Sequence, residues 1–205
     1  MNRLATWTRC ARFGREPDGT SAVEFALIVP LFLMLIFGIV DFSRALWAWN
    51  QAEKATQAGV RFAVVNNLVA GGLNFDGVPL AGGSGLPVPV AAVNNGNPIV
   101  CTSTSAGAVS CAPNGWGPVN TAAFNAIVAR MQVFFAAIGP ENVVIEYRHV
   151  GLGFAGNPYG PDIAPAVTVR LTGLAFNFLT PIVAGLVSIP MPAFAATLTG
   201  EDLSS

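Results

Sequence analysis

The sequence contains few charged residues. Only 10% of its 205 residues are Asp, Glu, Lys or Arg, whereas 53% are hydrophobic; an ordinary soluble domain carries about a quarter charged residues. The formal net charge of −1 gives no general attraction to nucleic acid, and no Lys/Arg cluster lies beyond the N-terminal region to create a local one. We therefore expect no nucleic-acid partner, and predict contact with a membrane or an assembly.

Groups that carry catalysis or bind metals are also scarce. The one histidine, His149, lies in "EYRHV" without the partners that a zinc site or a catalytic triad needs. The stretch "GLGFAG", Gly151 to Gly156, satisfies Gly-x-Gly-x-x-Gly, but Pro158 and Pro161 follow where a dinucleotide site requires a helix. No P-loop is present. We expect no enzyme activity, cofactor, metal or small-molecule substrate.

The N-terminal region holds a basic cluster followed by a long uncharged run. Arg3, Arg9, Arg12 and Arg15 precede residues 25–40, which contain no charged side chain. With Ser21–Val23 added, the run reaches the roughly 20 residues of a membrane-spanning helix. The positive-inside rule predicts a cytoplasmic N-terminus and an exported remainder. A secretory signal peptide is less suitable, since its apolar region is about 7–15 residues and ends in a small-x-small site.

The helical pattern continues beyond the run, and we expect one helix from about Ser21 to Val65. Pro30 removes one backbone hydrogen bond within it and crowds the carbonyl of Ala26, so a kink or loosened turn is expected there. Glu24, at the start of the apolar run, is unusual, because a lone carboxylate in hydrocarbon is costly. It either has a functional partner or extends to the headgroups without a role.

The residues around Glu24 resemble a known motif. Gly19 followed by Thr20-Ser21-Ala22-Val23-Glu24-Phe25 has the form of a type IV prepilin cleavage site. The longer string "GTSAVEFALIVPLFLMLIFGIVDFSRALW", with "QAGVRFA" behind it, resembles the TadE-like minor pseudopilins of the tight-adherence (Flp, type IVb) pilus system. The resemblance covers Gly19 to Ala63, under a quarter of the chain.

The resemblance implies that a prepilin peptidase cuts after Gly19 on the cytoplasmic side, leaving Thr20 as the new N-terminus. Glycine offers no side chain to obstruct a protease. In assembled type IV pilins, and by resemblance here, the Glu24 carboxylate pairs with the N-terminal ammonium of a neighbouring subunit. An unpaired carboxylate in a low dielectric is costly, so this pairing would set the register of assembly.

Beyond the long helix we expect an exported α+β domain. Residues 1–19 would form the leader, 20–65 the membrane and assembly helix, and 66–205 a pilin-like domain with a small antiparallel sheet and one extra helix. A Gly/Pro/Asn-rich loop region with short strands is expected over 66–118, and a helix over 119–138. Strands are expected in "NVVIEYRHV", "PAVTVRLTGLAF" and "AFAATLT". Glu146 and Arg148 share one strand face, where they either pair across the sheet with Arg170 or face solvent.

The cysteines suit this topology. Cys10 would lie in the reducing cytoplasm, whereas Cys101 and Cys111 would face an oxidising compartment and form a disulfide. Closing so short a loop contributes roughly 2–3 kcal/mol in the chain-entropy treatment. The alternative is that the two are unpaired small apolar residues.

Several residues of the helix have two interpretations. Asp41 and Arg44 either anchor the outer end of the span or contact a partner, or else they form a paired, solvated turn. Trp47 and Trp49 suit the membrane interface, while Trp49 also suits packing on the sheet. A small-residue face at Ala52, Ala55, Ala58 and Gly59 allows close packing, either between helices or beneath the sheet.

By resemblance, the expected partners are the prepilin peptidase, the major pilin, other minor pilins, the pilus assembly platform and membrane lipid. The expected location is the bacterial inner membrane, with a single span; a place in the fibre or at its tip stays open. One rival is an uncleaved single-pass membrane protein with an exported binding domain. Another is a membrane-anchored hydrolase, which requires a nucleophile and a base in one cleft.

Overall fold

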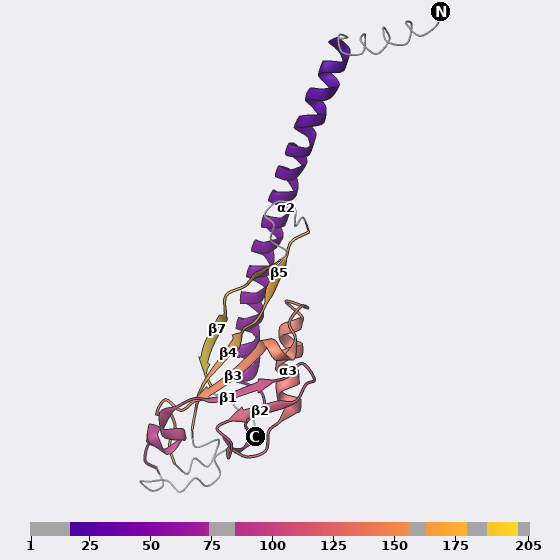
Figure 1. Cartoon of the computed structure of the whole chain (residues 1–205). Coiled ribbons are helices and arrows are strands. Elements are labelled where there is room, and N and C mark those ends of the chain that lie inside the picture. The colour runs from indigo at the N-terminus through magenta and orange to yellow at the C-terminus, as the bar shows by residue number, and fades with distance from the viewer. Residues whose placement is uncertain (1–16, 74–84, 156–162, 180–187, 201–205) are drawn as a thin grey trace, which may run out of the picture. The chain divides into compact units, whose positions relative to one another are not determined.

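The computed structural model describes residues 17–73, 85–155, 163–179 and 188–200, and the side chains from Ser21 onward. In chain order its elements are α2 (Pro17–Ala63), η1 (Gly71–Leu73), η2 (Val90–Ala92), η3 (Asn94–Gly96), β1 (Ile99–Ser103), β2 (Val109–Ala112), α3 (Thr121–Gln132), η4 (Pro140–Asn142), β3 (Val143–Arg148), β4 (Ala166–Leu171), β5 (Ala175–Asn177), β6 (Ser188–Pro190) and β7 (Phe194–Thr199). Figure 1 shows these elements along the chain. The expected α+β class, with a long apolar helix, a second helix and a small antiparallel sheet, is confirmed.

Helix α2 is longer at its start than expected. It begins at Pro17 rather than Ser21, because proline is well suited to the first helical turn, where its missing N–H has no intrahelical partner. It ends at Ala63 rather than Val65. The helix continues as one element through Pro30. Contacts divide the described chain into two compact units, and the boundary crosses α2 between Leu46 and Trp47.

The first unit contains α2 up to Leu46, together with residues 177–179 and Ser188. From Ser21 to Val40 no side chain of the helix is buried. Val29 is intermediate in exposure, and the other large apolar side chains of this part range from 37% exposed at Ile36 to 72% exposed at Leu31. Between Ser21 and Val40 the helix therefore keeps most of its apolar side chains exposed.

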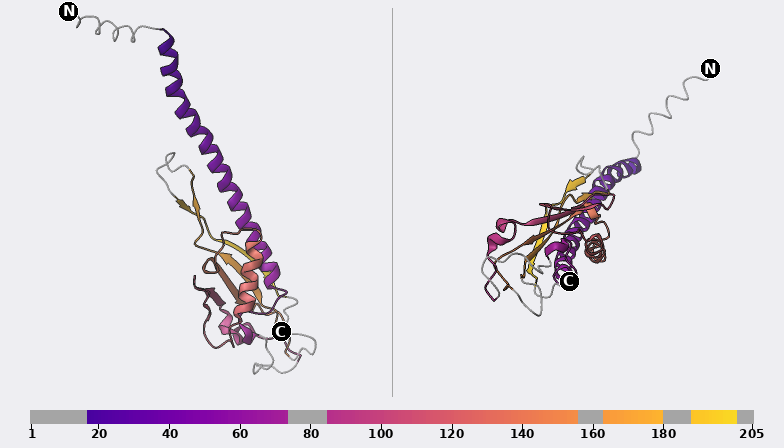
Figure 2. Two further views of the ribbon diagram at one scale, coloured as in Figure 1. Left: turned by 90° about the vertical axis from the view of Figure 1, so that its right-hand side faces the viewer. Right: turned by 90° about the horizontal axis from the view of Figure 1, so that it is seen from below.

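The second unit is built on a five-stranded antiparallel sheet with the order β2-β1-β3-β4-β7. Alternation along the strands buries one face, including Ile145, Tyr147 and Val169, which are at most 1% exposed. The second part of α2 and helix α3 lie on the same side of this sheet (Figure 2). Ala52, Ala55, Val60 and Ala63 of α2 join the resulting core.

Helix α3 is shorter than the predicted 119–138. Asn120 caps its start, since the Asn120 side chain accepts a hydrogen bond of 3.0 Å from the amide of Ala123. It ends at Gln132, whose side-chain amide donates to the Ile138 carbonyl at 2.8 Å. That bond holds the following turn and replaces the last part of the expected helix.

The strands follow the sequence pattern with two differences. The stretch "PAVTVRLTGLAF" is divided into β4 and β5, because Gly173 adopts φ +70° and breaks the extended run. Strand β5 leaves the main sheet and pairs with β6, which was not predicted. On the exposed face, Arg170 and Glu146 form an ion pair with an N–O distance of 3.0 Å, which is one of the two alternatives considered above.

Candidate functional site

The predicted processing site lies at the start of α2. Gly19 and Thr20 are within its helical residues, so their peptide bond is in a helical conformation rather than the extended one that a peptidase requires. Phe25 is 69% exposed. The Glu24 side chain is also exposed and forms no ion pair with any residue of the described chain. The structure therefore leaves this carboxylate available to a partner outside the molecule.

The uncharged run forms a continuous apolar surface. An 18-residue window within Ser21–Ala63 has a mean hydropathy of 2.7 and none of it is buried. Among the described helices this is the one candidate span. Exposed apolar surface of this extent marks a membrane or protein contact. The helix is compatible with a single-pass membrane protein.

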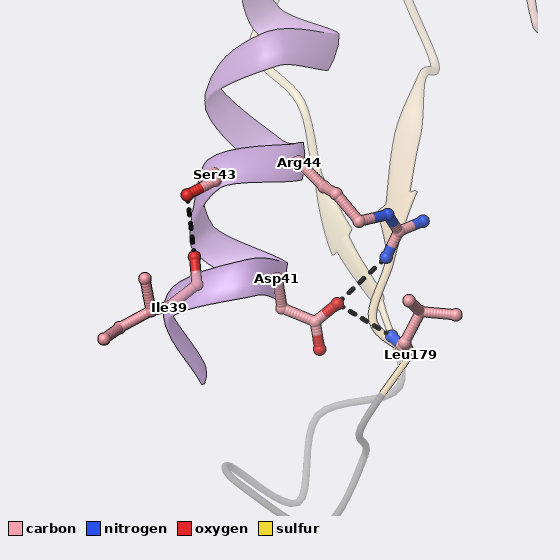
Figure 3. A network of polar contacts seen from close by, with 5 residues as sticks. All are labelled: Ile39, Asp41, Ser43, Arg44 and Leu179. Carbon is pink, nitrogen blue, oxygen red and sulfur yellow. Dashed lines mark hydrogen bonds and ion pairs between the residues drawn. The ribbon is translucent and has the colours of Figure 1, made fainter. Parts of the chain in front are cut away.

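The apolar run ends in a polar cluster around Asp41, shown in Figure 3. The Asp41 carboxylate is 4% exposed and accepts a hydrogen bond of 2.9 Å from Arg44 Nη1. It accepts a second one of 3.1 Å from the backbone amide of Leu179. Ser43 donates to the Ile39 carbonyl at 2.8 Å. The Asp41–Arg44 pair is therefore not a fully solvated turn, because a distant segment covers the carboxylate.

The contact with Leu179 was missed by sequence reasoning, since the two residues are 138 positions apart. One signal in the sequence points to it. No charged residue occurs from Leu171 to Gly200. A hairpin that faces water has no need to avoid charged side chains over so long a stretch. That signal suggests an apolar environment but does not identify Asp41 as the contact.

Beyond the cluster, α2 becomes part of the packed second unit. Trp49 is 44% exposed and its ring meets Phe194 edge-on, with centroids 5.2 Å apart; Trp47 is 67% exposed. Ala52 and Ala55 are fully buried. A Cβ atom placed on Gly59 would lie 2.7 Å from Met131 Sδ. Gly59 thus allows α3 to approach α2 closely, so at this position the small-residue face serves packing within the chain.

Arg61 lines a groove between α2 and α3. The groove has a volume of about 390 Å³, and Lys54, Arg61 and Arg130 contribute its charged side chains. Arg130 also lies over the Phe134 ring, 5.7 Å from its centroid. The groove contains no carboxylate among its lining residues, so it has a positive potential.

His149 is buried at 1% exposure. Its Nε2 lies 3.0 Å from the Val88 carbonyl oxygen, which can accept a hydrogen bond from it. Nδ1 has no hydrogen-bond partner in the described chain. Among the described residues, no group of three or more His, Cys, Asp or Glu side chains is placed to hold a metal ion.

The glycine motif at 151–156 is described as far as Ala155. Ala155 donates its amide hydrogen to the Leu86 carbonyl at 3.0 Å and accepts from the Gly85 amide at 2.7 Å. These bonds join two loops. The residues predicted to prevent a helix, Pro158 and Pro161, lie outside the described residues.

Cys101 and Cys111 occupy opposite positions on the adjacent strands β1 and β2. Their Cα atoms are 4.0 Å apart and the Sγ atoms are bonded at 2.03 Å. Both side chains lie on the buried face of the sheet, at 0% and 8% exposed. The disulfide thus closes the hairpin at an edge of the sheet.

Together these features define a membrane-compatible helix attached to a small α+β unit. Residues 19–61 match the family model described as TadE-like protein, which confirms the resemblance over the segment that carried it. The match covers about a fifth of the chain. No curated protein and no solved structure matches the chain. The TadE-like segment suggests a role in the tight-adherence pilus system and an association with pilus components in general.

Proposed function

We propose that the protein is a non-enzymatic minor pseudopilin that takes part in assembly of a tight-adherence pilus. The main support for this proposal is that the family match begins at the residue where the cut is predicted. The family match begins at Gly19, the residue of the predicted cut, and Glu24-Phe25 and the uncharged run follow at the expected spacing. In this proposal the prepilin peptidase removes residues 1–19, and the helix is retained as anchor and assembly element.

Glu24 carries the assembly role in this proposal. The carboxylate is exposed at the edge of a long apolar surface and has no ion-pair partner within the described chain. A carboxylate beside hydrocarbon is stabilised by an opposite charge. The free N-terminal ammonium of a neighbouring subunit, created by cleavage of that subunit, supplies that charge. The neighbours are the major pilin or other minor pilins, and the assembly platform holds the subunit before transfer.

The proposed location is the bacterial inner membrane, with the N-terminus in the cytoplasm and the second unit exported. The asymmetry of arginines around the span supports this orientation. The Cys101–Cys111 disulfide suits an oxidising compartment.

One observation favours an uncleaved single-pass membrane protein instead. The Gly19–Thr20 bond belongs to α2, and a peptidase must unwind the helix start to reach it. The first turn of a helix frays readily, because its amides have no intrahelical acceptors. Fraying of the first turn can therefore expose the Gly19–Thr20 bond to the peptidase. The two proposed functions differ in the N-terminus of the mature chain.

N-terminal sequencing of the protein from its native membrane tests the proposal. A chain that begins at Thr20 establishes processing, whereas a chain that begins at Met1, in cells that contain the peptidase, supports the single-pass alternative. Gly19→Phe should accumulate as the longer precursor, while Gly14→Phe, within the leader, serves as a matched control that is processed normally. Glu24→Gln should be processed but fail to crosslink to pilin subunits, which separates the two roles of the motif.

A further inference from the structure

In the polar cluster at the end of the apolar run, the Asp41 carboxylate is bonded to donors within the protein and has little contact with water. Asp41 is 4% exposed, although most of the side chains before it on the helix are exposed. Its carboxylate receives hydrogen bonds from Arg44 Nη1 at 2.9 Å and from the Leu179 amide at 3.1 Å. A carboxylate that enters a poorly hydrated region must find such donors within the protein. The Arg44 side chain is 40% exposed and can extend its charge toward water.

The Leu179 bond places a second segment at this level. The Leu179 side chain points away from the Asp41 carboxylate (Figure 3) and is 66% exposed. On the other side of the hairpin, Ile189 is 36% exposed. The sequence from Leu171 to Gly200 contains no charged residue. This stretch therefore lacks the charged side chains that would hold a loop in water.

The position of Asp41 along α2 fixes the depth of Leu179. Residues 25–40 contain no charge, and at about 1.5 Å per residue they nearly cross a hydrocarbon core of about 30 Å. Asp41 is the next residue. If the uncharged run spans the bilayer, the Leu179 amide lies at the outer boundary of the hydrocarbon, where apolar side chains are favoured beside headgroups.

We infer that Leu179, held in place by Asp41, makes a second membrane contact and inserts into the boundary between headgroups and acyl chains of the exported leaflet. The inference rests on the membrane-spanning helix of the proposed function. Lipid is the chosen partner because the Leu179 side chain is apolar and exposed at the level of Asp41, where the uncharged run of the helix ends. Asp41 is a positioning residue, and a contact at a second point restrains rotation of the helix about its axis in the bilayer.

Site-specific fluorescence in vesicles tests this contact. The full chain carries Cys10→Ser, which removes the one cysteine outside the Cys101–Cys111 disulfide. A single added cysteine is then the only free thiol, and it can be labelled with an environment-sensitive dye. Three positions are compared: Leu179→Cys at the proposed contact, Leu33→Cys within the span, and Ala195→Cys on the exposed part of β7. Each is reconstituted in phosphatidylcholine and phosphatidylglycerol vesicles. Lipids with a nitroxide near the carbonyl group quench from the membrane, and iodide quenches from water.

The expected result is that lipid nitroxide quenches the Leu179 label several-fold more than the Ala195 label, and that iodide quenches it several-fold less. If the Leu179 label behaves like the Ala195 label while the Leu33 label is quenched by lipid, the second contact is wrong and the span stands. Protection of Leu179 from both quenchers indicates burial against a second copy and also overturns the inference. If the Leu33 label is quenched by iodide instead, the membrane span of the proposed function fails as well.

Variants of Asp41 test its positioning role. Asp41→Ala removes the acceptor for the Leu179 amide and should lower lipid quenching at Leu179 several-fold without changing it at Leu33. Asp41→Asn keeps a side-chain oxygen and should retain a larger share of the quenching than Asp41→Ala. Equal quenching in all three proteins would show that Asp41 does not hold Leu179 at the membrane.

Discussion

Residues 21–40 and residues 52–63 belong to one helix, yet they differ in side-chain size and in burial. The first stretch carries large side chains such as Leu27, Leu31 and Phe32, which are 58–72% exposed. The second carries Ala52, Ala55 and Ala63, which are completely buried. Hydrophobicity alone therefore does not indicate which part of a helix enters a protein core.

The difference has a physical cause. Lipid chains are fluid and fit side chains of any shape, so a membrane-facing stretch needs only apolar area and no charge. A protein core is close-packed, and a helix on a sheet must present small or well-fitted side chains. Residues 52–63 meet that condition with alanines and Gly59, and they place Glu53, Lys54 and Arg61 on the exposed side. The predictions below test this contrast.

The largest effect is expected from truncating a phenylalanine in each region. Phe124 of α3 is 0% exposed, whereas Phe37 of the span is 47% exposed. Phe124→Ala should lower the free energy of unfolding of the second unit by about 3–5 kcal/mol, through lost burial and the cavity left behind. Phe37→Ala should change it by less than about 0.5 kcal/mol. Denaturant unfolding of the full chain in detergent, followed by near-UV circular dichroism, measures both; similar losses would contradict the contrast.

A somewhat smaller effect is expected from ionising Tyr147, which is 1% exposed in the core. Burial raises the pKa of its phenol from 10.0 to about 12, partly offset by the hydrogen bond from the Val69 amide. The unfolded chain loses this proton first, so the stability contribution is complete below pH 10 and is lost as pH rises to 12. Two pKa units correspond to about 2.7 kcal/mol.

Tyr147→Phe separates this titration from other alkaline effects. The variant leaves the Val69 amide without its partner and should be less stable at pH 7 by about 1–3 kcal/mol. It should also lack the Tyr147 part of the decline above pH 10, so the difference between the two proteins narrows toward pH 12. Denaturant midpoints measured at several pH values decide this, and a constant difference would be inconsistent with the raised pKa.

Gly59 tests the close packing of the second region. Its Cβ position is 2.7 Å from Met131 Sδ, so Gly59→Leu should lower the free energy of unfolding by about 1–3 kcal/mol through overpacking. Met131→Ala in the same chain should recover part of that loss, because it frees the occupied space. The matched change Gly38→Leu, in the span, should have a much smaller effect on the second unit. If Met131→Ala recovers none of the free energy of unfolding lost in Gly59→Leu, the clash does not involve Met131.

Much of the fold could be predicted because local patterns determine it. The uncharged run fixes the first part of α2, and alternation in "PAVTVRL" fixes β4 and its buried face. The end of α3 could not be predicted, since the apolar period continues to Ile138 while the helix ends at Gln132, whose side chain bonds to the Ile138 carbonyl. A side-chain bond to a carbonyl six residues away leaves no trace in the period.

The candidate site shows the same limit. The resemblance to a prepilin cleavage site points to Gly19, Glu24 and Phe25 from the sequence, because that motif is contiguous. The partner of Asp41 is a backbone amide at Leu179, and any residue except proline offers one. A contact of this kind depends on the path of the chain between β5 and β6, which composition does not specify.

The smallest effect is expected at the ion pair on the open face of the sheet. Arg170 and Glu146 are diagonal neighbours on β4 and β3, since Glu146 is paired with Thr168. Their side chains are 47% and 17% exposed, so water weakens the attraction, and Arg170→Gln should cost only about 0.2–1 kcal/mol. Because salt screens exposed charges, that difference should disappear near 1 M salt. Denaturant unfolding at low and high salt measures it. A loss of unfolding free energy above about 1 kcal/mol that persists in high salt would contradict this. It would mean that the ion pair is shielded from water, as the Asp41 carboxylate is, and that this face of the sheet has a partner of its own.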